Sequence, residues 1–211
     1  MIDMQIDLAS VGMEKGKQYE TIITTTSCDD IKNAAPIGVI CAGQDKVLNR
    51  IFKGSRTLEN IISKREFIVN ITHNPEVFTL STVGNLPENY FNEDNSLKCA
   101  DAYFKCEVIS LKEAVKQSDP VKSNGEAIVI KSKVTQLVIN KQTRPINRGF
   151  GYVIESLSNL TRVDIVGEEQ KEEYFERFRE ANRIVTKVGY KQDIEAMQKI
   201  KKELIKKGFK P

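Results

Sequence analysis

The segment 52–60, FKGSRTLEN, holds the residues of this sequence that are best suited to chemistry. It combines cationic, hydroxyl and amide side chains, namely Lys53, Ser55, Arg56, Thr57 and Asn60. A helix N-terminus carries unpaired N–H groups and a partial positive charge, and side chains of these types can donate to phosphate oxygens. The pattern is therefore typical of a phosphate-binding turn between a strand and a helix. The alternative is a polar turn with Thr57 as the helix cap and solvated cations.

A second segment, NAAPIG at 33–38, joins a polar turn to small residues. It contains Asn33, Ala35, Pro36 and Ile37. Small side chains allow a flat ligand to approach the backbone closely. A plain hairpin is the alternative, because a proline that cannot donate is also typical of a strand start or a sheet edge.

The remaining reactive residue types form no recognisable catalytic group. His73 is the one histidine and lies in the turn THNP, where an exposed or capping role is expected rather than catalysis. The four cysteines include no CxxC pair, so we expect reduced thiols and no metal site. Cys41 lies on an expected strand and is interpreted as a core residue.

Six runs in the first two thirds of the chain have the alternation or the β-branched content of strands. They span residues 19–26, 35–42, 47–52, 66–72, 103–111 and 126–140. Short helices are expected at 57–64 and after Asn74, where Pro75 would occupy the first turn. The connections are short, and barrel closure removes exposed strand edges, so the pattern favours a small antiparallel barrel.

The last part of the chain is expected to be helical. Apolar residues recur at intervals of three and four in 150–163, in 171–188 and after Asp193, and Gly189 offers a helix end between the last two. The predicted fold class is thus mainly β with α, a six-stranded antiparallel split barrel followed by helices. We expect a barrel domain at 1–142 and a C-terminal helical subdomain at 143–211.

Composition excludes several classes of protein. The 211 residues are 40% hydrophobic and 29% charged, which is ordinary for a globular chain that needs no disulfides to fold. The net charge of +3 comes from residues 168–211, which include 12 basic and 9 acidic residues. The chain as a whole is therefore not a polybasic nucleic-acid binder, although the stretch from Lys199 could touch an anionic partner.

No targeting or membrane-spanning segment is expected. The N-terminal stretch carries Asp3 and Asp7 and lacks a basic start, so it does not have the pattern of a signal peptide. No apolar run has the length needed to cross a bilayer. We expect a cytoplasmic protein that makes no membrane contact.

Three motifs, in this order, resemble the FMN-binding split-barrel superfamily of flavin reductases and pyridoxamine-phosphate oxidases. They are TIITTTSCDDIKNAAPIGV, RIFKGSRTLEN and EFIVNIT, within 19–72. The later stretch INRGFGYVIESLSNLTR resembles the helical part of a small conserved family of flavin-binding proteins of unassigned function. Each motif alone is weak, and their ordered combination makes the resemblance specific.

The resemblance implies a split barrel that forms a homodimer, with one FMN per subunit near the interface. The phosphate would be held by Lys53, Ser55, Arg56 and Thr57, with Asn60 near it. The isoalloxazine would be lined, largely through backbone groups, by Thr24, Thr25, Asn33, Ala35, Pro36 and Ile37.

Arg148, in the helical part, would place a cation near the flavin, where it would stabilise an anionic reduced ring. A capping asparagine with solvated arginines is the alternative for this region.

These features predict a flavin-dependent oxidoreductase with an unidentified small-molecule electron donor or acceptor. One alternative is a flavin carrier or sensor without turnover. Another is a nucleic-acid-binding barrel, which would need exposed aromatic residues interleaved with cations on its strands. The aromatic residues of the expected strands are too dispersed for this, so we do not expect nucleic acid as a partner.

Overall fold

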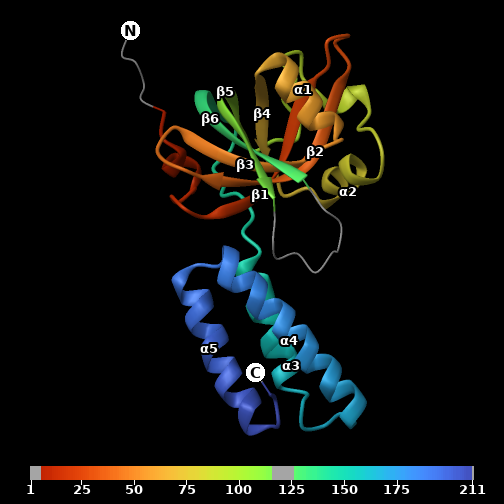
Figure 1. Cartoon of the computed structure of the whole chain (residues 1–211), viewed down its shortest axis with the longest axis vertical. Helices are drawn as coiled ribbons and strands as arrows, with labels where there is room; N and C mark the ends of the chain where they lie inside the picture. The colour runs from red at the N-terminus through yellow and green to blue at the C-terminus, as the bar shows by residue number, and fades with distance from the viewer. Residues whose placement is uncertain (1–5, 116–125, 211) are drawn as a thin grey trace. The chain divides into compact units, whose positions relative to one another are not determined.

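The computed structural model describes residues 6–115 and 126–210. The chain divides into two compact units, Met1–Ile146 and Asn147–Pro211, each with secondary structure of its own kind. The first is built on strands and the second on helices (Figure 1).

The first unit is a closed barrel in which neighbouring strands are antiparallel, in the order β1-β2-β3-β6-β5-β4. The strands are β1 (Gln18–Thr26), β2 (Lys32–Cys41), β3 (Lys46–Phe52), β4 (Glu66–Ile71), β5 (Ala102–Val115) and β6 (Glu126–Ile139). Their side chains alternate between the barrel interior and its outer face, as the period of a strand requires. The expected six-stranded antiparallel barrel with additional helices is confirmed.

In the described part of this unit, two α-helices and two short 3-10 helices accompany the strands. They are α1 (Arg56–Lys64), α2 (Pro75–Val83), η1 (Leu8–Val11) and η2 (Glu88–Tyr90). Asn74 caps α2 by accepting from the N–H groups of Glu76 and Val77, and Pro75 occupies the first helical position. Beside α2, Ile22 and Ala34 from the outer face of β1 and β2 are buried in a cluster with Val77.

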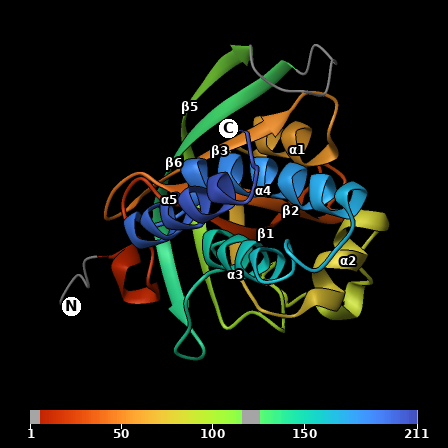
Figure 2. The same ribbon diagram turned by 90° about the horizontal axis from the view of Figure 1, so that it is seen from below.

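The second unit is a bundle of α3 (Gly149–Leu160), α4 (Glu168–Val188) and α5 (Lys191–Lys206), seen side by side in Figure 2. Its core contains Phe178, Val185 and Met197, which lie on the apolar faces expected from the sequence. Helix α5 begins two residues before the expected Asp193. The reason is that the Asp193 carboxylate accepts from the N–H of Tyr190, so the acidic residue lies in the first turn rather than at the cap.

Among the residues that the structure describes, no helix combines the length and apolarity needed to cross a membrane.

Candidate functional site

The N-terminus of α1 and the turn before it form the first part of the candidate site. Gly54 has a φ of 78°, a left-handed conformation that glycine adopts without strain. Ser55 is the helix cap: its hydroxyl accepts from the Leu58 N–H at 3.3 Å and donates to the Phe52 carbonyl at 3.0 Å. The idea that Thr57 caps this helix is therefore wrong, because the helix begins at Arg56 and Thr57 already lies inside it.

The start of α1 also offers donors of its own. The first N–H groups of an α-helix, here those of Arg56 and Thr57, have no acceptor within the helix. Together with the helix dipole, they make this end of α1 suitable for an anion.

The two cations of this turn lie at the surface and have protein partners. Arg56 is exposed, and its Nη1 donates to Oδ1 of Asn85 at 2.9 Å. The Lys53 ammonium forms an ion pair with Glu113 at 2.9 Å. The hydrogen bond from Lys53, together with its charge, holds the pKa of Glu113 below its ordinary value. An anion that binds Lys53 must therefore compete with this carboxylate.

A network of amide and hydroxyl side chains joins α1 to β1 and β2. Asn33 Nδ2 donates to Thr57 Oγ1 at 2.9 Å and to Thr25 Oγ1 at 3.4 Å. Asn60 Nδ2 donates to the same Thr25 oxygen at 3.0 Å. Thr25, Thr57 and Asn60 are at most 6% exposed. These side chains therefore fix the position of the helix start relative to the strands. They form their hydrogen bonds with one another.

The predicted ring-lining residues lie on the neighbouring antiparallel strands β1 and β2. Ala35, Pro36 and Ile37 are half-buried on β2. Thr24 is fully buried on β1 and accepts from Nδ2 of Asn70. Because Asn33 bonds to Thr57, the segment at 33–37 directly adjoins the start of α1. The structure thus brings the predicted phosphate and ring residues of the barrel into one region.

Arg148 belongs to the second unit, where it immediately precedes α3. Next to it, Asn147 Oδ1 accepts from the Gly149 N–H at 2.8 Å, which is the capping role considered for this region. The role of Arg148 toward a flavin stays a prediction.

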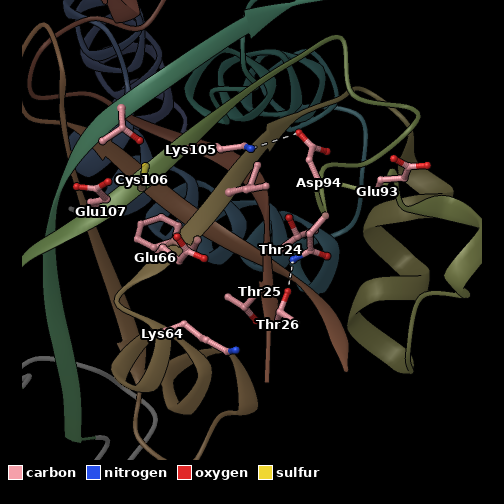
Figure 3. Close-up of a pocket in the computed structure, with 14 residues that line it drawn as sticks. Thr24, Thr25, Thr26, Lys64, Glu66, Glu93, Asp94, Lys105, Cys106 and Glu107 are labelled. Atoms are coloured by element: carbon pink, nitrogen blue, oxygen red, sulfur yellow. Dashed lines mark hydrogen bonds and ion pairs between the residues drawn. The ribbon is translucent and has the colours of Figure 1, made fainter. Parts of the chain in front are cut away.

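A pocket of about 370 Å³ opens beside the end of β1 (Figure 3). Thr24, Thr25 and Thr26 form one side, and the loop residues Asp94 and Asn95 form another. Asn95 has a φ of 68°, and its Nδ2 donates to the Thr26 hydroxyl at 2.9 Å. This loop was not among the predicted site residues. The cluster of asparagines in 85–95 was its only signal in the sequence.

The charges in this pocket are mixed. Figure 3 shows Lys105 reaching toward Asp94, with which it forms an ion pair at 3.7 Å. Burial raises the pKa of Asp94, but hydrogen bonds from Ser96 and Tyr103 and the charge of Lys105 together outweigh it, so the pKa lies below its ordinary value. The carboxyl of Asp94 therefore stays ionised, and its ion pair keeps the Lys105 side chain in the lining of the pocket. Glu66 and Glu107 line the pocket as well. A polar molecule suits such a lining better than an apolar one.

Histidine and cysteine contribute little to this region. His73 is exposed, and its Nδ1 lies 3.3 Å from the carboxylate of Asp101. Cys41 and Cys106 are buried, and burial raises the pKa of both thiols, so neither is prepared to act as a thiolate nucleophile. Among the described residues, no group of three or more His, Cys, Asp or Glu side chains could hold a metal ion.

A closed six-stranded antiparallel barrel, with a polar helix start at one end of its β1–β2 hairpin, has the architecture expected of the split-barrel proteins. Comparison with known families is more specific. The N-terminal domain model of DUF447, a family described as being of unknown function, matches residues 19–141, and a second DUF447 model matches residues 147–202. The chain belongs to the DUF447 family, and the resemblance found in its motifs is confirmed.

Two relatives match most of the chain. An uncharacterized protein of Methanocaldococcus jannaschii is 28% identical over 172 residues, which cover 80% of this chain and 88% of the relative. A crystal structure of an FMN-bound DUF447 protein from Methanosarcina mazei is 28% identical and has a TM-score of 0.52. That match covers 93% of this chain and 100% of the other.

A flavin reductase, PheA2, is 16% identical with a TM-score of 0.45, and the match covers 60% of this chain and 83% of that one. At this level of similarity the match says nothing about the ligand of this chain.

Proposed function

We propose that this chain binds FMN through the start of α1 and the adjoining ends of β1 and β2. The observation that carries the proposal is the turn at 53–57, where a helix N-terminus is flanked by the cations of Lys53 and Arg56. Support comes from the Methanosarcina mazei protein, which is FMN-bound, belongs to the same family and aligns over nearly the whole chain.

The residues present fit such a cofactor. A phosphate carries two negative charges and accepts several hydrogen bonds, and this turn offers N–H groups and two cationic side chains. The side chains of Thr25, Asn33 and Thr57 hold one another, which leaves the adjoining β2 backbone to approach a flat ring. Bound FMN would supply hydride or electron transfer, while the chain fixes its orientation and excludes solvent.

We further propose a flavin-dependent oxidoreductase that works as a homodimer with FMN near the interface. The pocket beside Thr24 and Thr25 has room for a small polar electron donor or acceptor next to the expected ring. Four free cysteines suit the reducing compartment expected for the protein, the cytoplasm. Sedimentation would test the dimer, and turnover with a reduced nicotinamide would separate an enzyme from a carrier.

The absorption spectrum of the purified protein, with release of the bound chromophore, tests the cofactor. For the site itself, the double variant Lys53→Ala/Arg56→Ala should bind FMN more weakly by roughly 2–5 kcal/mol while keeping its fold. The control Lys187→Ala/Lys191→Ala removes two exposed charges from the helical unit and should leave the affinity unchanged. A folded double variant with unchanged affinity would refute this phosphate site.

A further inference from the structure

The outer face of β3 and β6, with the adjoining part of β5, carries a group of lysines. We call this surface the lysine face. It consists of the exposed residues Lys46, Lys112, Lys131 and Lys133, with half-buried Leu48 and Val129 between them.

The strand register places these side chains together. Val47, Asn49 and Ile51 on β3 are buried in the barrel, so the residues that alternate with them, Lys46 and Leu48 among them, point outward. Lys46 lies directly opposite Lys133, and Leu48 lies opposite Lys131. Like charges placed opposite each other in a sheet destabilise it, so stability of the isolated chain does not explain this arrangement.

The charge of the lysine face is not neutralised within the protein. Among the described residues, none of its four lysines has an ion-pair partner, whereas Lys53 and Lys105 are paired with Glu113 and Asp94. Glu107, which is exposed opposite Lys133, adds one carboxylate at the border of the face. An excess of positive charge therefore remains available to an anionic partner.

The surroundings of the lysines favour a protein as that partner. An aliphatic centre, here Leu48 and Val129, with a charged rim is the usual anatomy of a protein interface. Single-stranded nucleic acid requires several aromatic stacking platforms, and only Phe52, 54% exposed, stands at the end of this part of β3. A second copy of the chain would bring lysines against lysines, because a two-fold interface pairs the same patch with itself.

We propose that the lysine face docks a small acidic electron-carrier protein. The inference rests on the proposed FMN function, because the carrier must have a flavin to reduce. β3, which carries Lys46 and Leu48 of the face, ends at Phe52, and Lys53 of the phosphate turn follows immediately. Two reduced iron–sulfur carriers would each give up one electron, and two protons from solvent would complete the conversion of FMN to its dihydro form.

The test uses the full-length, FMN-loaded protein and a reduced acidic [2Fe–2S] ferredoxin as the probe. Stopped-flow absorbance would follow the loss of the flavin band. For Lys131→Glu/Lys133→Glu we expect the second-order rate constant to fall at least about tenfold at low ionic strength, and the difference to shrink in high salt. The control Lys187→Glu/Lys191→Glu makes the same charge change on exposed positions of α4 and α5 and should alter the rate less than about twofold.

A second measurement separates the two proposals. Calorimetry of FMN-free protein with oxidised ferredoxin reports docking alone, and FMN titration of both variants reports the cofactor site alone. Loss of ferredoxin binding only in the Lys131/Lys133 variant would support the lysine face even if FMN failed to bind.

Three results would overturn the docking proposal. One is an equal effect of both charge reversals, and another is unchanged ferredoxin binding by the Lys131/Lys133 variant. The third is evidence for another partner. If this variant no longer formed the homodimer, the lysine face would be a dimer interface, and if a thymidine oligonucleotide bound the face more tightly than ferredoxin, it would be a nucleic-acid site.

Discussion

At the level of single residues, Ser55 decides where α1 begins. Its hydroxyl satisfies the Leu58 N–H, and its extended backbone directs the preceding turn. Replacing Ser55 with alanine should lower the free energy of unfolding by about 1 kcal/mol, whereas glycine should cost only a few tenths. Urea unfolding measures both. Ser158→Ala, inside α3, is the control, and an equal loss there would contradict the capping role.

Glu113 competes with a bound phosphate for Lys53. Glu113→Gln should therefore tighten FMN binding at neutral pH, by about two- to fivefold because the pair is exposed. The hydrogen bond and charge of Lys53 lower the pKa of Glu113, so the pair persists above the ordinary carboxyl pKa and is lost as the pH falls through the lowered one. FMN titrations across this acidic range should show the advantage of the variant disappearing. Glu169→Gln, which changes an exposed carboxylate of α4, should have no such effect.

The sequence could predict only the local part of the candidate site. Lys53, Ser55 and Arg56 follow one another, so their grouping at the start of a helix is visible in the residue order. Glu113 and Asn85 were missed because their contacts with this turn depend on tertiary folding, and Glu113 lies 60 residues from Lys53. Mistaking Thr57 for the cap has a similar cause, since its hydroxyl accepts a hydrogen bond from Asn33 on β2.

At the level of strands, two buried asparagines have opposite environments. Asn70 on β4 donates to the Ile22 carbonyl and the Thr24 hydroxyl and accepts from the Leu97 N–H. Asn49 on β3 is 1% exposed, and its amide has no hydrogen-bond partner among the described residues. One asparagine therefore binds β1 and a loop to β4, while the other carries an uncompensated cost of burial.

The same substitution should therefore change stability in opposite directions at these two sites. Asn70→Leu should lower the free energy of unfolding by at least about 2 kcal/mol, because it leaves buried backbone groups without partners. Asn49→Leu, of similar volume, should raise it by about 1–2 kcal/mol. Thermal or urea unfolding provides the comparison, with each variant as the control for the other. A loss of stability in both would show that Asn49 has a partner of its own.

The strands and helices themselves were largely predictable, because alternation and helical spacing are properties of adjacent residues. Differences lie at their ends. β2 begins at Lys32 rather than 35, since Lys32 and Asn33 pair with Thr26 and Thr25 on β1 despite their turn-forming types. The long β5 continues past 111 because β6 supplies partners as far as Val115. Pairing between strands thus extended elements that local propensity would have ended.

At the level of the whole molecule, each unit has buried hydrophobic residues of its own. The helical unit encloses Phe178, which is 2% exposed and packs edge-on against Phe209 with ring centroids 5.3 Å apart. The barrel encloses Phe104, which is fully buried. A substitution that disrupts one core need not disrupt the other, so we expect each unit to have its own free energy of unfolding.

Hydrogen exchange can test this independence with two matched substitutions, each of which replaces a buried phenylalanine with alanine. Phe178→Ala should destabilise the helical unit by about 3–5 kcal/mol, because it opens a cavity among tightly packed rings. Amides of α4 and α5 should then exchange faster, while those of β1 and β4 keep their protection. Phe104→Ala should produce the reverse pattern, with the barrel exposed and the bundle protected. If either substitution accelerated exchange in both units to the same degree, the chain would unfold as one cooperative body, and FMN binding by the barrel would then depend on the integrity of the helices.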